Sequence, residues 1–171
     1  MTIKHLLISV FLLYCMPMLS APSDDDPLSA LEGTWYVHMS NFKMWLKGNK
    51  HHPAFIYTIQ TRKGIRGFRD VVRYTKHGKT KQIVGFDRPE NEQATSFTWR
   101  GKGLLALFKS KWEIVYQTDE WVLIHFQKTL ATAEGYDVIS RKKRFDPETI
   151  AAIKLKLKEL GVSGLKDIPQ E

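Results

Sequence analysis

Apolar and polar residues alternate along most of the chain, with short polar or glycine-containing breaks between the alternating segments. In the first such segment Trp35, Val37 and Met39 share one face of an extended strand. Seven further segments have similar lengths: 53–61, 68–76, 80–87, 94–100, 110–117, 121–128 and 136–142. Eight short strands at nearly even spacing predict an antiparallel sandwich or barrel.

The alternation is blurred only in 121–126, which predicts a strand covered on both faces by the rest of the protein. A helical period follows near the C-terminus. Asp146 and Pro147 form a helix start signal, and Gly161 is the stop. Between them one apolar stripe is formed by Ile150, Ile153, Leu157 and Leu160. We expect one amphipathic helix over about 146–160 that docks on the barrel wall, with a helix lying on a membrane surface as the alternative.

The N-terminus has the shape of a secretory signal peptide. Lys4 precedes an apolar run that is too short for a good transmembrane helix, and small residues end at Ala21. We therefore predict a signal peptide over 1–21, a polar leader over 22–30 and a single domain over 31–171. The protein is expected to be exported, periplasmic or secreted.

Cys15 leaves a second route open, because bacterial lipoproteins are cut before a lipid-modified cysteine. Tyr14 stands where such a site wants a small residue, so free export is the first prediction and an outer-membrane lipoprotein the alternative. Cys15 is also the single cysteine, and removal of 1–21 leaves no thiol. The exported chain then has no disulfide, thiolate metal site or cysteine nucleophile.

Composition excludes several classes of protein. With 171 residues and 43% hydrophobic residues, the chain is one globular domain, neither disordered nor a two-domain cofactor enzyme. It has none of the common phosphate, dinucleotide, serine-hydrolase or zinc motifs, so we predict no cofactor and no metal. His51 and His52 are adjacent in a loop without a third ligand and are interpreted as polar loop residues.

Three stretches resemble the motifs of the lipocalin family. Residues 31–37 contain Gly33 and Trp35, as in the first-strand GxW motif. Thr118 and Asp119 match the family's TDY turn, with Glu where tyrosine is usual. Arg141 lies on the last predicted strand, just before the helix, and is similar to the family's final-motif arginine, which lies over the GxW tryptophan. The resemblance covers about residues 30–165. The C-terminal sequence is most similar to the bacterial, apolipoprotein D-like outer-membrane branch.

This resemblance implies an eight-stranded up-and-down barrel with one C-terminal helix, forming a cup closed at one end by Trp35. An arginine over that ring would gain cation–π attraction, and Asp119 would accept backbone N–H bonds in its turn. We regard these motif residues as structural. Candidate cavity residues, which could equally be core, are Val37, Met39, Phe55, Tyr57, Ile59, Phe86, Trp99, Tyr116, His125 and Tyr136.

The formal net charge is +8, and basic residues cluster in the first half of the chain. They are Lys43, Lys47, Lys50, Arg62, Lys63, Arg66, Arg69 and Arg73. If they formed the rim of the cup, they would favour a fatty acid, a lysophospholipid or another anionic amphiphile. The alternative is an ordinary solvated surface.

The function that fits best is an exported, non-catalytic carrier or scavenger of a small hydrophobic or amphiphilic molecule. One alternative is a lipocalin-fold enzyme acting on a lipid through His125, Tyr57 or Tyr116. Another is a cationic protein that binds the cell envelope. We expect a monomer, with peripheral or lipid-anchored membrane association left open. Nucleic-acid binding is excluded, since the aromatic and basic residues of 99–103 form one isolated stretch.

Overall fold

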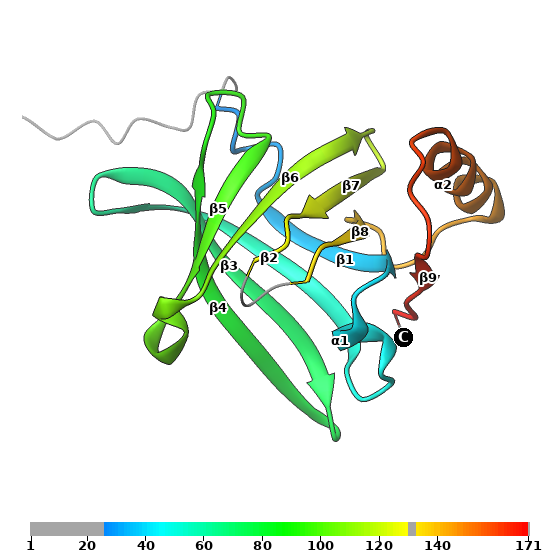
Figure 1. The fold of residues 1–171 in the computed structure, drawn as a ribbon, viewed down its shortest axis with the longest axis horizontal. Coiled ribbons are helices and arrows are strands. Elements are labelled where there is room, and N and C mark those ends of the chain that lie inside the picture. Colours follow the sequence, from blue (N-terminus) through cyan, green and yellow to red (C-terminus); the bar gives the residue numbers. More distant parts are fainter. Residues whose placement is uncertain (1–25, 130–132, 171) are drawn as a thin grey trace, which may run out of the picture.

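The computed structural model describes residues 26–129 and 133–170, and the predicted signal peptide lies outside them. Its strands are β1 (Gly33–Ser40), β2 (His51–Arg62), β3 (Ile65–Lys76), β4 (Lys79–Pro89), β5 (Ser96–Gly101), β6 (Lys109–Gln117), β7 (Trp121–Phe126), β8 (Gly135–Ser140) and β9 (Lys166–Asp167). Each of the first seven strands pairs antiparallel with the next, and β1 pairs with both β2 and β8. The sheet therefore closes into the predicted up-and-down barrel, with β9 added beside β1 (Figure 1).

Two tight turns show why the longest strands form where they do. Lys63 and Gly64 connect β2 to β3, and His77 and Gly78 connect β3 to β4. All four residues have positive φ, between 50° and 77°. Two-residue turns with this conformation have the twist of a β-hairpin, and glycine at the second position adopts it without strain.

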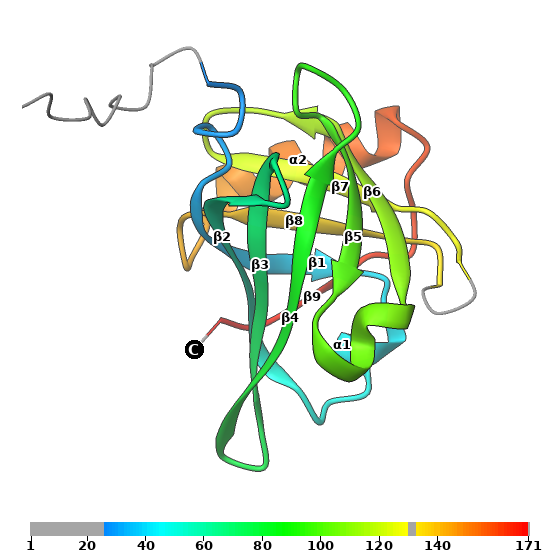
Figure 2. The same ribbon diagram turned by 90° about the vertical axis from the view of Figure 1, so that its left-hand side faces the viewer.

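Three helical elements complete the described part of the chain. Helix α1 (Lys43–Leu46) and the 3-10 helix η1 (Gly103–Leu107) lie at the same end of the barrel (Figures 1 and 2). Helix α2 (Pro147–Glu159) packs outside the barrel wall. None of the helices in the described part of the chain is long and apolar enough to cross a membrane.

Helix α2 begins as its sequence predicts. The Asp146 carboxylate accepts a 2.7 Å hydrogen bond from the Thr149 N–H, and Pro147 is the first helical residue. Ile153 and Leu157 are buried against an outer cluster formed by Met39, Trp121, Leu123 and Val138. This covering of β7 explains its blurred alternation. Leu160 belongs to the predicted stripe but is 41% exposed, because the helix ends before it.

Two β-bulges reverse the direction of side chains that the alternation places inside. The register between β1 and β8 shifts between Val37 and Met39, so Val37 is in the barrel core and Met39 is in the outer cluster. The register between β6 and β7 shifts between Ile114 and Tyr116, and Tyr116 then packs on the outer side beside Trp121. The inward direction predicted for Met39 and Tyr116 is therefore wrong.

One end of the barrel is closed in the predicted way. The Trp35 indole N–H donates to the Leu31 carbonyl at 2.8 Å, and the Arg141 guanidinium lies 4.3 Å from the centre of the ring. Arg141 also donates to the Ala30 carbonyl at 2.8 Å. Gly33 has a φ of 112°, and a Cβ there would lie 2.7 Å from the Arg141 guanidinium. The GxW glycine therefore makes room for the arginine.

The turn between β6 and β7 differs in one detail from the expectation. The Thr118 hydroxyl accepts hydrogen bonds from the backbone N–H groups of Glu120 and Trp121, at 3.2 and 3.0 Å. Asp119 is exposed at the tip of the turn. Thr118 therefore has the role that the sequence assigned to Asp119.

Candidate functional site

The end of the barrel opposite to Trp35 holds an open cavity of about 490 Å³. Aromatic residues are the largest group in its wall, and the residues that line it are Asn41, Phe42, Lys43, Met44, Trp45, Phe55, Tyr57, Asp70, Val72, Ile83, Trp99, Ser110, Trp112, Phe126, Ala133, Glu134 and Asp137. Cavities that bind small molecules in proteins have about this size and this mixture of apolar walls with few polar groups. The geometry therefore fits one small ligand.

Toward the closed end of the barrel, the cavity is bounded by a packed aromatic core. The rings of Phe97 and Trp112 are stacked with centroids 4.3 Å apart, and Tyr57 stacks on Trp112 at 5.8 Å. Phe68 and Phe97 are fully buried below. The core thus fills the closed half of the barrel and leaves the open half hollow.

The connection from β1 to β2 folds over the open end. Phe42, Met44 and Trp45 line the cavity from this segment, and Trp45 is buried. The Asn41 amide oxygen accepts a 2.8 Å hydrogen bond from the Tyr136 N–H, which ties the segment to the start of β8. A Cβ at Gly135 would lie 2.7 Å from the Asn41 side chain, so this glycine permits the contact. The segment is thus a fixed part of the wall.

Three aspartates point into the barrel, and each is paired with a tryptophan. The Trp112 indole N–H donates to Asp87 Oδ1 at 2.8 Å. Trp99 lies beside Asp70 and lowers its pKa, and Ser40 and Trp45 do the same for Asp137. All three carboxyls are buried, with at most 5% exposed.

One oxygen of each carboxyl lacks a hydrogen-bond partner among the described residues: Asp70 Oδ1, Asp87 Oδ2 and Asp137 Oδ1. Asp70 and Asp137 line the cavity, as does Ser110, whose hydroxyl also lacks a partner in the described part of the chain. Buried polar atoms in proteins are usually hydrogen-bonded. Asp70, Ser110 and Asp137 are therefore polar residues of the cavity wall whose hydrogen bonding is incomplete.

Burial sets the protonation of these groups. It raises the pKa of Asp87 to about 7 and that of Asp137 to about 7, against the opposing effect of the indole hydrogen bonds. Burial and then the nearby Asp87 raise the pKa of Asp70 well above its usual range. The pKa of Tyr57 is raised by burial and then by the charges of Asp70, Asp87 and Asp137.

A glycine on β4 makes one of these pairs possible. A Cβ on Gly85 would lie 2.1 Å from the indole nitrogen of Trp99. Because Gly85 lacks this atom, the Trp99 ring crosses β4 and reaches Asp70 on β3. In the sequence Asp70 shares the spacing of the inward residues Phe68 and Val72, and that regular spacing was the signal available for it.

The ten candidate cavity residues separate into three groups. Phe55, Tyr57 and Trp99 line the cavity. Val37 and Ile59 belong to the core below it. The remaining candidates lie on the outer face of the sheet: Met39, Phe86, Tyr116, His125 and Tyr136.

Two of the outer candidates have evident structural roles. Phe86 faces outward because Asp87, the next residue, takes the inward position on β4 and bonds Trp112. The His125 ring stacks on Tyr136 with centroids 4.6 Å apart. Its nitrogens lie 3.1 Å and 3.2 Å from carboxylate oxygens of Glu113 and Glu134. His125 is therefore a satisfied surface histidine, and the prediction that Phe86, His125 and Tyr136 line the interior is wrong.

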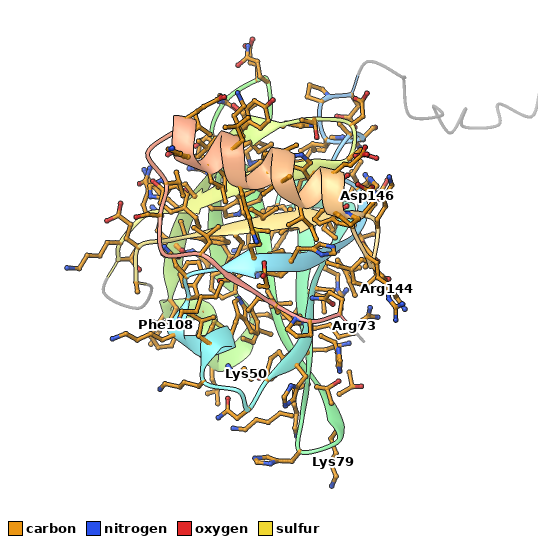
Figure 3. All side chains as sticks on the ribbon, turned by 90° about the vertical axis from the view of Figure 1, so that its right-hand side faces the viewer. Lys50, Arg73, Lys79, Phe108, Arg144 and Asp146 are labelled. Carbon is orange, nitrogen blue, oxygen red and sulfur yellow. The ribbon has the colours of Figure 1, made fainter. Side chains whose placement is uncertain are left out.

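The basic residues do not form a ring around the opening. Lys43 lines the cavity, and the Lys50 ammonium lies over the rings of Tyr74 and Trp45, at 4.7 and 5.7 Å (Figure 3). Lys47 is exposed on the same connection. Three others belong to the β2–β3 hairpin at the closed end, and two point outward along β3: Arg62, Lys63, Arg66, Arg69 and Arg73. The predicted basic rim is reduced to Lys43 and Lys50.

No set of metal ligands is formed by the described residues. Among them no group of three or more histidine, cysteine, aspartate or glutamate side chains is arranged to hold an ion. His51 and His52 lie beside each other, with ring centroids 6.0 Å apart, at the start of β2.

Comparison with known proteins identifies the architecture. No protein-family profile matches the sequence, and no curated protein matches it significantly. Solved structures do match. Insecticyanin from the tobacco hornworm Manduca sexta has a TM-score of 0.66 at 9% identity, over 82% of this chain and 79% of that one. The cockroach allergen Per a 4 gives 0.65 at 13% identity, over 84% and 88%.

The bovine lipocalin allergen Bos d 2 gives a TM-score of 0.56 at 11% identity, over 83% of this chain and 93% of that one. Identities this low establish the fold and no more. The chain has the lipocalin fold, as its three sequence motifs predicted.

Proposed function

We propose that this chain is an exported, non-catalytic binding protein that carries or scavenges one small hydrophobic or amphiphilic molecule in the barrel cavity. The observation that carries the proposal is the 490 Å³ cavity with aromatic walls at the open end. Each methylene that a ligand buries there contributes about 0.8 kcal/mol before ordering costs. A similar solved structure, the siderocalin Ex-FABP, is described as having dual ligand specificities.

The cavity lining supports binding better than catalysis. Ser110 offers a hydroxyl, but none of the described side chains accepts its proton, so it is not an activated nucleophile. The one histidine proposed for catalysis, His125, is paired with two glutamates on the outer face of the sheet. A lipid-transforming enzyme is therefore the less favoured candidate.

Ligand class and cellular setting are the finer parts of the proposal. The sequence suggests a fatty acid or lysophospholipid, but the cavity leaves an anionic head group a place only beside Lys43 at the opening, because Asp70 and Asp137 line the interior. Export rests on the signal-peptide pattern of 1–21, and an envelope setting rests on the resemblance to the bacterial, apolipoprotein D-like branch. We propose a monomer.

An apolar fluorescent probe and a pair of tryptophan substitutions test the proposal. Val72→Trp fills the cavity, since Val72 lines it, whereas Val115→Trp adds the same ring to the exposed outer side of β6. The unaltered protein and Val115→Trp should bind the probe with similar affinity, and Val72→Trp should lose binding at least tenfold. Equal binding by all three folded proteins would contradict a ligand site in the cavity.

A further inference from the structure

The cavity contains an excess of acid that its own side chains do not neutralise. Asp70 and Asp137 line it, Asp87 lies on the adjoining strand, and each has a free oxygen. The single basic side chain in the described lining is Lys43, which is exposed at the opening. None of the ion pairs formed by the described residues includes these three aspartates.

Aromatic rings surround the same free oxygens. Tyr57, Trp99 and Trp112 present ring surfaces to the cavity, and Phe55 is stacked 6.1 Å from Tyr57. Ring faces attract cations, and they attract them more strongly where water is excluded. Carboxyls and ring faces together favour a compact positive charge that also donates hydrogen bonds, and such a charge would in turn favour the ionised form of the carboxyls.

We propose that the ligand of this cavity is an organic cation, with a protonated amine on an aromatic or alicyclic body. The ammonium group would donate hydrogen bonds to the carboxyls of Asp70 and Asp137, which line the cavity, and the apolar body would lie against the tryptophan rings. This inference rests on the proposed function, because it names the ligand class of the same cavity. It also reverses the preference for anions that the basic residues of the sequence suggested.

The hydrogen bonds that hold the carboxyls support a prepared site. The Trp112 indole N–H holds one oxygen of Asp87 and leaves the other without a partner, and the indoles of Trp99 and Trp45 lie beside Asp70 and Asp137 in the same way. Gly85 is required for one of these contacts. A structure that needed only a packed interior would place apolar residues at these inward positions.

Calorimetric titration with three ligands of one shape tests the proposal: 2-(1-naphthyl)ethylamine, 2-(1-naphthyl)ethanol and 1-naphthylacetate. We expect the amine to bind at least tenfold more tightly than the alcohol, and the carboxylate to bind most weakly. Asp70→Asn and Asp137→Asn should each weaken amine binding about tenfold and leave alcohol binding unchanged. Asp167→Asn removes an exposed carboxylate on β9 and is the matched control.

The outcomes separate this inference from the proposed function. If the alcohol or the carboxylate binds as tightly as the amine, the cavity is a binding site but its preference for cations is refuted. The same holds if an apolar probe binds and none of the three naphthyl ligands does. If neither the probe nor any naphthyl ligand binds, the proposed function fails as well. Alcohol binding by the two asparagine variants shows that they are folded.

A second feature, on the surface, leads to an independent proposal. Leu104 is 96% exposed and Leu107 is 92% exposed on η1, and Phe108 beside them is 46% exposed. Exposed residues on both sides of this segment are basic: Arg100, Lys102, Lys109 and Lys111. The segment stands at the end of the barrel that carries α1 (Figure 2), and Trp99 and Ser110, which flank it, line the cavity.

We infer that η1 inserts into the surface of an anionic lipid membrane and brings the opening of the barrel to it. Bulky apolar side chains with nearly full exposure enter the interfacial region of a bilayer. The four flanking cations are attracted to anionic lipid head groups, and this attraction weakens at high salt. A ligand could then pass between the membrane and the cavity.

Vesicle co-sedimentation tests this second inference. Vesicles of phosphatidylcholine with 30 mol% phosphatidylglycerol should bind the protein at least tenfold better than pure phosphatidylcholine, and less well in high salt. The double variant Leu104→Ser, Leu107→Ser should lose binding to the anionic vesicles, whereas Leu155→Ser, which alters an exposed leucine of α2, should keep it. Absence of binding by the unaltered protein, or equal binding by both variants, would overturn the inference.

Discussion

The two ends of the barrel use the same side chain for opposite purposes. At the closed end the Trp35 indole bonds a backbone carbonyl, and the ring is covered by Arg141. At the open end the Trp112 indole bonds Asp87, and the indoles of Trp45 and Trp99 lie beside Asp137 and Asp70; each of the three carboxyls has one oxygen without a partner among the described residues. Tryptophan therefore closes one end of the barrel with its indole N–H bonded to the backbone. At the other end, tryptophans lie beside buried carboxyls at the cavity.

The difference has an energetic meaning. Polar groups at the closed end of the barrel have hydrogen-bond partners, so this end contributes to stability. The carboxyls of the open end are buried with incomplete partners, which costs stability and is expected where a site is prepared for a ligand. The fold tolerates this cost because the aromatic core between the two ends is densely packed.

The largest expected effect is a loss of stability when the packing at the closed end of the barrel is removed. Trp35→Ala should lower the free energy of unfolding by about 3–5 kcal/mol, because a fully packed ring is removed and Arg141 loses its platform. Trp99→Ala should cost clearly less, since Trp99 is half-buried on an open cavity. Urea denaturation of both variants measures the contrast. Equal losses would show that the two ends are packed alike.

The next effect concerns pH at the open end. Burial raises the pKa of Asp137 from 3.8 to about 7, so between these values the folded protein binds more protons than the unfolded chain. Stability should therefore fall as pH rises from about 4 to 8, and the Asp137 contribution amounts to roughly 4 kcal/mol.

Asp137→Asn isolates this contribution. The variant keeps the size of the side chain but cannot ionise, so its unfolding free energy should depend less steeply on pH over the same window. Chemical denaturation at pH 4, 6 and 8 measures the slopes. Parallel curves for the variant and the unaltered protein would mean that Asp137 is not desolvated in the folded state.

A smaller effect concerns the contact between Arg141 and Trp35 at the closed end of the barrel. Arg141→Lys keeps the positive charge but loses the planar group over Trp35 and the fixed hydrogen bond to Ala30. We expect a loss of about 1–2 kcal/mol in thermal or urea unfolding. Arg62→Lys, an exposed substitution at the end of β2, should stay within about 0.5 kcal/mol. If the two lysine variants are equally stable, the contact over Trp35 adds nothing.

Much of the fold could be predicted from local pattern, and much of the site could not. The spacing of Trp35 and Val37, the Asp146 helix start and the motif arginine at 141 report nearby or repeated geometry, which sequence carries well. The side chain of Met39 was misplaced because a bulge adds one residue to β1, and nothing in the alternation marks it.

The candidate site was missed for a different reason. Phe55, Tyr57 and Trp99 were found as apolar residues of the right phase, whereas Asp70 and Asp137 were passed over because charged residues are rarely buried. Their inward spacing was visible, but the partners that make burial tolerable come from other strands and from α1. Such contacts depend on barrel closure, and no single segment encodes them.

The most direct test of the central claim is native mass spectrometry of the protein purified from its own host, beside the Val72→Trp variant. We expect one small molecule bound per chain, released on denaturation. It should be missing from Val72→Trp, whose added ring occupies the cavity. A bare protein mass that stays bare after incubation with apolar and amine ligands would contradict it. So would a bound molecule retained equally by the filled variant.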